Sequence, residues 1–189
     1  IYTNQAAGAL GYVPDLPQGG IAGNTSDRIV CYWQAFGLNS AFGPPYNLGR
    51  TATHEVGHYL GLHHTFDGGC GSASACYTTG DRICDTNPDA SPHYGCGSQS
   101  SCGSPDPVNN YMDYSDDVCM TEFTEEQTRR MRCTLENYRS GLIGPDDGCL
   151  PAQIASRTGG SNLQSYTATA PELGSNMLGS VVHFTSGHE

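Results

Sequence analysis

Hydrophobic positions recur with the period of a helix in a segment that covers roughly residues 48–60. The apolar members of this series are Ala52, Val56, Tyr59 and Leu60. Because residues three or four apart lie on one side of a helix, the pattern predicts a helix from Leu48 to Leu60. Gly61 supplies the left-handed residue that commonly ends a helix.

A second helical pattern follows a capping sequence. Thr124 is followed three residues later by Gln127, and Ser or Thr with Glu or Gln at this spacing forms a capping box. The apolar residues of one face of this segment are Met131, Leu135 and Tyr138. The sequence therefore predicts a helix that runs to about Arg139.

The rest of the chain reads as short strands and loops. Residues 29–33 are β-branched and aromatic and predict a strand, within a segment of turns that covers residues 1–47. Residues 67–109 show no periodic pattern and consist mainly of Gly, Ser, Asp, Pro and Cys. A loop of this length inside a compact domain needs disulfides or a metal ion in place of a hydrophobic core.

The cysteine content points to an oxidising compartment. Nine cysteines in 189 residues are typical of a secreted, disulfide-bonded protein, and the odd number leaves one thiol unpaired or bonded outside this chain. A cysteine-based zinc cluster is the alternative, but the sequence contains no Cys-x-x-Cys pair. No signal peptide or membrane-spanning run is visible, and residue 1 is Ile, so the chain reads as a processed or partial product.

The charge of the chain argues against some classes of binding partner, and a change in composition divides the chain into two parts. Acidic residues outnumber basic ones, 19 to 8, which argues against nucleic acid and anionic membranes as partners. The excess suits calcium or basic substrates, or a surface that only keeps the protein soluble. Residues 144–189 are poor in charge and rich in Ser, Thr and Gly, which indicates a linker or the start of an appended module with a possible strand at 181–184. Residues 1–143 then form the main domain.

The pattern His-Glu-x-x-His-x-x-Gly-x-x-His at residues 54–64 carries the strongest chemical signal. His54 and His58 are four residues apart, so on a helix both can offer imidazole nitrogens to one metal ion. A turn at Gly61 returns His64 as a third ligand. Three neutral nitrogen ligands leave one position open for water, which is the arrangement of a catalytic zinc site.

Glu55 lies beside this metal site without being a ligand. Zinc lowers the pKa of bound water to about 7, so that this water attacks a peptide carbonyl at neutral pH. Glu55 is the expected general base, which takes the proton of the water and delivers it to the leaving amine. The alternative is a helix whose histidines only pack or face solvent. His63 is one residue too early for the motif and is expected to face solvent or to contact a ligand.

The motif is that of metzincin peptidases, which also carry a methionine-containing turn beneath the metal. Several other segments resemble the pappalysin family of metzincins: residues 48–51, 64–66, 80–86, 110–120 and 123–124. The resemblance covers roughly residues 1–140. It implies an α+β fold with a twisted sheet, an active-site helix, a loop-rich disulfide-bonded lower subdomain and a C-terminal helix. It also implies a secreted zinc endopeptidase that acts on protein or peptide substrates.

The resemblance assigns roles to single residues. Met112 would form the apolar floor beneath the metal, and Tyr114 would donate a hydrogen bond to the tetrahedral intermediate. Asp117 would lie at the base of the pocket for the residue just after the cleaved bond (P1′) and favour Arg or Lys there. Ordinary packing is the alternative for Met112 and Tyr114, and Asp116 could be confused with Asp117.

A calcium site and a disulfide pattern are also implied. The calcium ligands would be Asp81, Asp85 and Thr86, unless this turn only faces water. The implied pairs are Cys96 with Cys119, and Cys102 with Cys70 or Cys76.

The segment before the motif is short for the family. Only 53 residues precede His54, about half of what metzincins usually carry. A missing N-terminal segment or propeptide is therefore an expected partner, with Cys31 as a candidate for bonding to it. Two other classes remain as alternatives: a binding module that keeps an inactive protease fold, and a disulfide-rich structural domain without metal.

Overall fold

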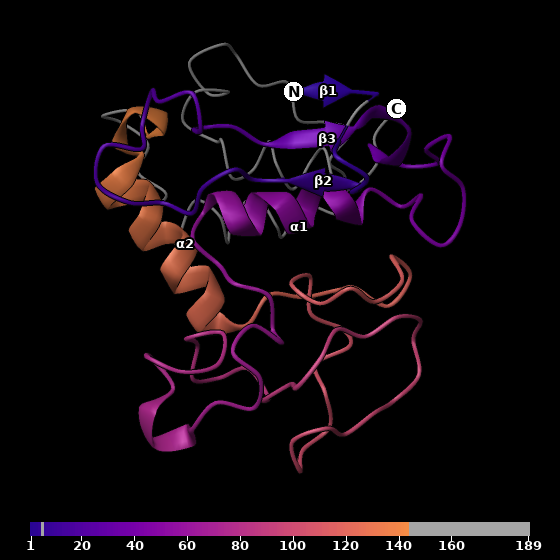
Figure 1. Ribbon diagram of the computed structural model, residues 1–189, viewed down its shortest axis with the longest axis vertical. Helices are drawn as coiled ribbons and strands as arrows, with labels where there is room; N and C mark the ends of the chain where they lie inside the picture. The colour runs from indigo at the N-terminus through magenta and orange to yellow at the C-terminus, as the bar shows by residue number, and fades with distance from the viewer. Residues whose placement is uncertain (5, 144–189) are drawn as a thin grey trace, which may run out of the picture.

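The computed structural model describes residues 1–4 and 6–143. The interpretation of residues 144–189 as a linker or appended module, and of 181–184 as a strand, lies outside the described residues. Figure 1 shows a small sheet with one helix beneath it, an irregular lower part, and a second helix beside both. Within the described residues, no helix has both the length and the apolar character needed to cross a bilayer.

The sheet contains three short strands in the order β1-β3-β2. Their bounds are Tyr2–Thr3 for β1, Gly11–Tyr12 for β2 and Val30–Tyr32 for β3. β1 runs parallel to β3, and β2 runs antiparallel to it, so Cys31 lies opposite Tyr2 on one side and Gly11 on the other. The predicted strand at 29–33 is confirmed in place but is shorter, because the short 3-10 helix η1 (Trp33–Ala35) follows at once.

Helix α1 spans Arg50–Tyr59 and begins later than the predicted helix at Leu48. The backbone of Gly49 is left-handed (φ 81°), which prevents the helix from starting earlier. Gly61 follows the helix with φ 93°, as predicted for its end. The buried side chains of α1 are mostly polar, whereas Val56 of the predicted apolar face is only half-buried, because α1 lies between the sheet and the lower loops.

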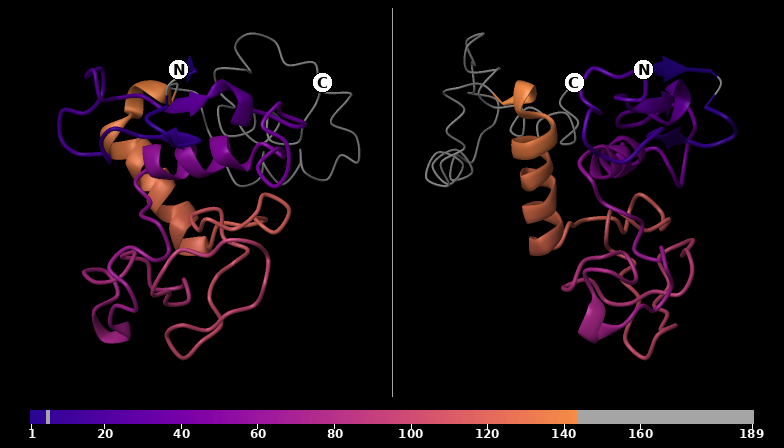
Figure 2. Two further views of the ribbon diagram at one scale, coloured as in Figure 1. Left: turned by 45° about the vertical axis from the view of Figure 1, so that its right-hand side comes forward. Right: turned by 60° about the vertical axis from the view of Figure 1, so that its left-hand side comes forward.

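Helix α2 spans Glu125–Tyr138 and rises from the lower loops to the level of the sheet (Figure 1, Figure 2). The capping box is confirmed: the Thr124 hydroxyl accepts from Gln127 N at 3.2 Å, and Gln127 Oε1 accepts from Thr124 N at 2.9 Å. Of the predicted apolar face, Met131 packs against the core, but Tyr138 is 42% exposed.

The apolar core of the lower part is small and consists of Leu62, Ile83 and Met112, with Phe123 and Met131 against it. Disulfides therefore supply much of its order. The three disulfides of the described residues join Cys70 to Cys102, Cys76 to Cys84 and Cys96 to Cys119. The first and third confirm the expected pairs.

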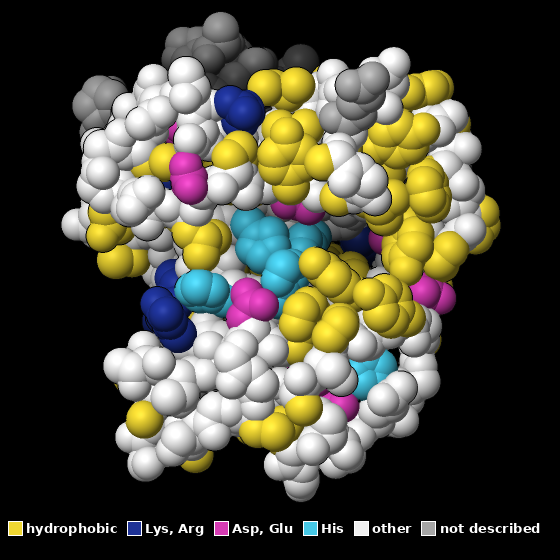
Figure 3. All heavy atoms as spheres, viewed as in Figure 1, with side chains coloured by type: hydrophobic (Ala, Val, Ile, Leu, Met, Phe, Trp, Pro, Cys, Tyr) yellow, Lys and Arg dark blue, Asp and Glu magenta, His cyan; other side chains and the backbone are white. Residues whose placement is uncertain are grey.

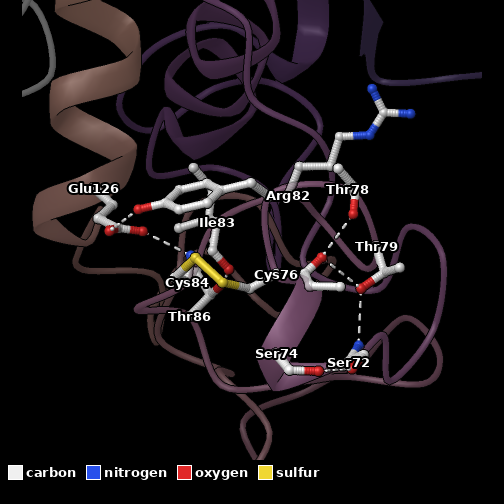
Figure 4. The surroundings of a disulfide bond; sticks show 12 residues. Ser72, Ser74, Cys76, Thr78, Thr79, Arg82, Ile83, Cys84, Thr86 and Glu126 are labelled. Carbon is white, nitrogen blue, oxygen red and sulfur yellow. Dashed lines mark hydrogen bonds between the residues drawn. A yellow bond between two sulfur atoms is a disulfide. The ribbon is translucent and has the colours of Figure 1, made fainter.

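The Cys76–Cys84 bond was not expected, and it closes a short loop next to Glu126 of helix α2 (Figure 4). Cys84 N donates to Glu126 Oε2 at 2.7 Å, next to the disulfide. The same loop contains the short 3-10 helix η2 (Ala73–Ala75). Among the described cysteines, Cys31 is free and buried, and Cys133 is free and exposed.

A partly buried ion pair joins the end of α2 to the N-terminal part of the chain. Arg139 is 2% exposed, and its Nη2 lies 2.8 Å from Asp27 Oδ1, while its guanidinium carbon lies 3.7 Å from the Tyr59 ring centroid. Burial raises the pKa of Asp27, but hydrogen bonds from Gly23 N and the Tyr59 hydroxyl, together with Arg139, outweigh burial and lower it.

Replacing Asp27 with Asn is expected to lower the free energy of unfolding by about 3 kcal/mol near neutral pH, because the Arg139 charge is then buried without a partner. Since the pKa of Asp27 is lowered on folding, its contribution is present above its unfolded pKa of about 4 and is lost as the pH falls below that value. Urea denaturation of both proteins at pH 7 and pH 3 measures this. Equal free energies at pH 7 would show that the pair contributes nothing.

Candidate metal centre

Three imidazoles converge in the hollow between the sheet-containing part and the lower loops. His54 and His58 come from α1, and His64 follows the turn at Gly61. One ring nitrogen from each lies within 4.8 Å of the others, and the Nε2 atoms of His58 and His64 are 3.0 Å apart. Figure 3 shows histidine side chains gathered at the centre of this face. The structure therefore brings the three predicted ligands together.

Backbone carbonyls hold two of the rings in one tautomer. His54 Nδ1 lies 2.6 Å from Tyr111 O, and His58 Nδ1 lies 2.8 Å from Leu62 O. A carbonyl oxygen only accepts, so each Nδ1 carries the proton and each Nε2 is left with a lone pair. Burial, followed by the neighbouring His64, lowers the pKa of His58 to about 4, so this ring is neutral at physiological pH.

The third ring, that of His64, also presents a nitrogen lone pair to the space between the three imidazoles. His64 Nδ1 lies 3.4 Å from Asp67 Oδ1, which favours the proton on Nδ1 and a lone pair on Nε2. Two lone pairs that face each other at 3.0 Å, between His58 and His64, repel unless a cation lies between them. The donor set is therefore suited to zinc, which binds neutral imidazole nitrogens. The Asp67 carboxylate also lies near His63, with 3.6 Å between His63 Nδ1 and Asp67 Oδ2.

Glu55 is buried beside these rings and is 5% exposed. Burial raises its pKa to about 8. Its Oε2 has no hydrogen-bond partner among the described residues. Gly11 of β2 packs directly on this side chain, because a Cβ at Gly11 would lie 2.7 Å from Glu55 Cγ. The close approach of β2 therefore holds the carboxylate next to the metal centre.

Met112 lies beneath α1 and is fully buried. A Cβ at Gly57 would lie 2.3 Å from Met112 Sδ, so this glycine allows the helix to rest on the thioether. Met112 O accepts from Thr65 N at 3.1 Å, and Met112 N donates to Asn110 Oδ1 at 2.9 Å. The turn is thus tied to the residue that follows His64.

Tyr114 faces the same centre and is 37% exposed. Its ring centroid is 4.8 Å from that of His64 and 5.0 Å from that of Phe66. Burial, followed by the charge of Glu55, raises its pKa, so the phenol keeps its proton. Tyr114 can therefore donate a hydrogen bond to an oxygen next to the imidazoles.

A cleft of about 680 Å³ runs past the metal centre and contains Asp117 in its wall. Asp117 Oδ2 accepts from Leu48 N at 2.7 Å and from Arg50 N at 3.3 Å, so the carboxylate also binds the N-terminal end of α1. Asp117 is 2% exposed, and burial raises its pKa despite these hydrogen bonds. A buried carboxylate of this kind favours a basic group nearby.

The predicted calcium ligands are only partly brought together. Asp81 Oδ2 accepts from the Thr86 hydroxyl at 2.7 Å, and Asp81 Oδ1 accepts from Ile83 N at 3.0 Å. Asp85 Oδ2 instead accepts from Glu126 N at 2.9 Å, at the start of α2. These hydrogen bonds already occupy oxygens that a calcium ion would use.

The sequence patterns did not identify Gly11 or Asp67 as parts of the site. Asp67 follows His64 by three residues, and a carboxylate at that spacing is a usable signal. Gly11 carries no local signal, because its role arises from the pairing of β2 with β3.

Comparison with known proteins gives consistent matches. A family profile described as Pregnancy-associated plasma protein-A matches residues 5–136. Extracellular metalloprotease 1 of Coccidioides posadasii is 42% identical over 144 residues, which cover 74% of this chain and 50% of that protein. An extracellular metalloprotease of Colletotrichum graminicola is 50% identical over 99 residues, which cover 50% of this chain and 33% of that protein.

Solved structures with the same fold include mature mirolysin of Tannerella forsythia in complex with a cleaved peptide. This match has 34% identity and a TM-score of 0.57, and it covers 73% of this chain and 55% of that chain. The chain spans half or less of the length of the curated relatives described above.

Proposed function

Since the chain belongs to the pappalysin family of metallopeptidases, whose profile covers residues 5–136, we propose that it is a secreted zinc-dependent endopeptidase. Relatives named as extracellular metalloproteases support both the activity and the location. The observation that carries the proposal is the convergence of three imidazoles beside Glu55, whose Oε2 has no hydrogen-bond partner among the residues that the structure describes. The substrates are proteins or peptides that enter the cleft in extended form.

The roles of the residues follow from their positions. Zinc, when held by His54, His58 and His64, activates water as a nucleophile and withdraws electrons from the substrate carbonyl. Glu55 takes the proton of the attacking water at Oε2 and delivers it to the leaving amine. The Tyr114 phenol donates a hydrogen bond to the oxygen on which negative charge develops. Met112 supports α1 from below, which limits the movement of the imidazoles.

Mapping of cleavage sites in a peptide library tests this function directly. Cleavage should occur with zinc, stop with a chelator, and return when zinc is added back. A protein that holds stoichiometric zinc but cleaves no peptide would favour the alternative of a binding module with a protease fold. A folded protein without zinc would favour a purely structural domain.

The preference for Arg or Lys after the cleaved bond rests on Asp117. Replacing Asp117 with Asn keeps an oxygen that can accept from Leu48 N, so the start of α1 is preserved. The loss of charge should reduce the selectivity for basic over neutral residues at P1′ by about tenfold or more. Library profiles of the two proteins measure this, and Asp116→Asn is the matched control. An unchanged profile would reject the assignment of the pocket.

Replacing Gly11 with Ala should lower kcat by about 10²-fold while zinc is retained, because the added Cβ displaces Glu55 by about an ångström. Gly19→Ala is a suitable control, since a Cβ at Gly19 meets nothing within 4 Å. Peptide hydrolysis and zinc content of both variants provide the measurement. A Gly11 variant with native kcat would show that the contact does not position the base.

A calcium ion held by Asp81, Asp85 and Thr86 is a secondary part of the proposal, and only the family resemblance and the oxygen donors of this loop support it. Equilibrium dialysis with calcium tests this part. Absence of calcium binding at millimolar concentration would remove it without affecting the zinc site.

A further inference from the structure

A second group of metal-ligating side chains lies apart from the three histidines. Asp89, His93 and Asp113 each offer one ligand atom, and these atoms lie within 4.8 Å of one another. All three residues are buried, with at most 3% exposed. Asp106, which is also buried, lies next to them, with 3.9 Å between its Oδ2 and His93 Nδ1. The lower loop therefore places an imidazole and three carboxylates in one enclosed region.

Hydrogen bonds within the protein satisfy some of these groups and leave others without a partner. Asp113 accepts from the Ser115 hydroxyl at 2.6 Å and from His93 N at 3.1 Å. In contrast, neither ring nitrogen of His93 has a hydrogen-bond partner among the described residues, and the same is true of Asp106 Oδ2. Buried polar groups are nearly always paired, because an unpaired group costs its full desolvation energy. The His93 ring therefore points to a bound ligand.

The charges of this region call for a cation. Asp89, Asp106 and Asp113 together bring up to three negative charges into a buried volume. The sequence contains no lysine. The ion pairs of the described arginines go instead to Glu125, Glu136 and Asp27. A protonated His93 would supply a single positive charge, whereas a divalent ion supplies two and also binds the neutral ring.

We propose that Asp89, His93 and Asp113, with Asp106 beside them, bind a second divalent transition-metal ion, for which Zn²⁺ is the best candidate. Mixed imidazole and carboxylate donors suit zinc, whereas Ca²⁺ requires about six to eight oxygen ligands. Zinc bonds of about 2.0–2.2 Å in a tetrahedral arrangement place two donors about 3.3–3.6 Å apart. Donors that already lie within 4.8 Å of one another reach that geometry by side-chain rotations that move them by about an ångström.

The surrounding hydrogen bonds orient the proposed ligands. The Thr65 hydroxyl donates to Asp89 Oδ2 at 3.3 Å, and Ser101 N and its hydroxyl both donate to Asp106 Oδ1 at 2.9 Å. Thr65 directly follows His64, and Asp113 directly follows Met112. An ion in this second site thus braces two segments that support the three-histidine centre. Loss of the ion should weaken zinc affinity at that centre by about tenfold.

Metal analysis of the intact chain tests the proposal. After dialysis against metal-free buffer, the wild-type protein should hold about two zinc ions per chain, and His93→Gln and Asp89→Asn about one. His58→Ala should lose the ion of the three-histidine centre and keep the other. His63→Ala is the matched control, because His63 belongs to neither group of ligands. Circular dichroism establishes that each variant is folded.

Three results would overturn the proposal. These are a wild-type protein with a single zinc ion, a folded His58→Ala variant with none, and His93→Gln and Asp89→Asn variants that both keep the wild-type content. Calcium in place of zinc at this site would contradict the assignment to a transition metal. The test is independent of catalysis: a His58→Ala variant that keeps one zinc ion supports the second site even if the wild-type protein cleaves no peptide.

Discussion

Replacing Glu55 with Gln is expected to lower kcat by about 10²–10⁴-fold while the protein keeps its zinc, because the amide cannot take a proton from water. The amide has nearly the same shape as the carboxylate, so the packing against Gly11 is preserved. Steady-state hydrolysis of a peptide, together with zinc analysis, measures both parts of this expectation. Thermal unfolding should change little, because Oε2 has no hydrogen-bond partner among the described residues.

The Glu55 result separates catalysis from metal binding. Glu136→Gln makes the same exchange at an exposed position of α2 and serves as a control for nonspecific effects on turnover. A Glu55→Gln variant with native kcat would exclude Glu55 as the general base. A variant that lost its zinc would show instead that the carboxylate stabilises the ion.

Replacing His58 with Ala is expected to remove both the zinc of the three-histidine centre and all measurable peptide hydrolysis. His58 provides one of three converging nitrogens, and the contact of its Nδ1 with Leu62 O fixes the orientation of the ring that alanine removes. The affinity for zinc at this centre should fall by several orders of magnitude. His63→Ala, one residue before a ligand, should leave this zinc in place.

Competition with a chromogenic chelator gives the zinc affinity of each histidine variant. Retention of native affinity by the His58 variant would mean that the three rings do not share one ion. Loss of zinc from both the His58 and the His63 variants would instead indicate a general loss of structure, which circular dichroism would detect.

Features encoded by short spacings were predictable from the sequence. Three ligands that lie within eleven residues, two of them on one helical turn, follow from the geometry of a helix and a glycine turn. The capping box of α2 is equally local, since the side chains of Thr124 and Gln127 each accept a hydrogen bond from the other's backbone N–H. The structure shows the convergence of the three imidazoles and the capping box that these spacings predict.

Features that depend on distant parts of the chain were missed. The contact of Gly11 with Glu55 exists only when the sheet has formed, so the local sequence around either residue does not indicate it. The approach of Asp89 to Asp113 joins two loops without periodic pattern, and the pair of Arg139 with Asp27 joins the end of α2 to a turn far away in the sequence. The apolar face of α1 was misjudged for a physical reason: this helix buries mostly polar side chains, so the spacing of its hydrophobic residues does not show which side is covered.

Asn110 and Gln127 share two amide hydrogen bonds, of 2.8 and 3.1 Å, in a fully enclosed setting. Asn110 Oδ1 also accepts from Met112 N, and Gln127 Oε1 also accepts from Thr124 N. Fraying of the first turn of α2 would therefore release the methionine turn at the same moment. The two segments should open as one cooperative unit, with matched rates of amide hydrogen exchange, although Met112 and Thr124 are 12 positions apart in the chain.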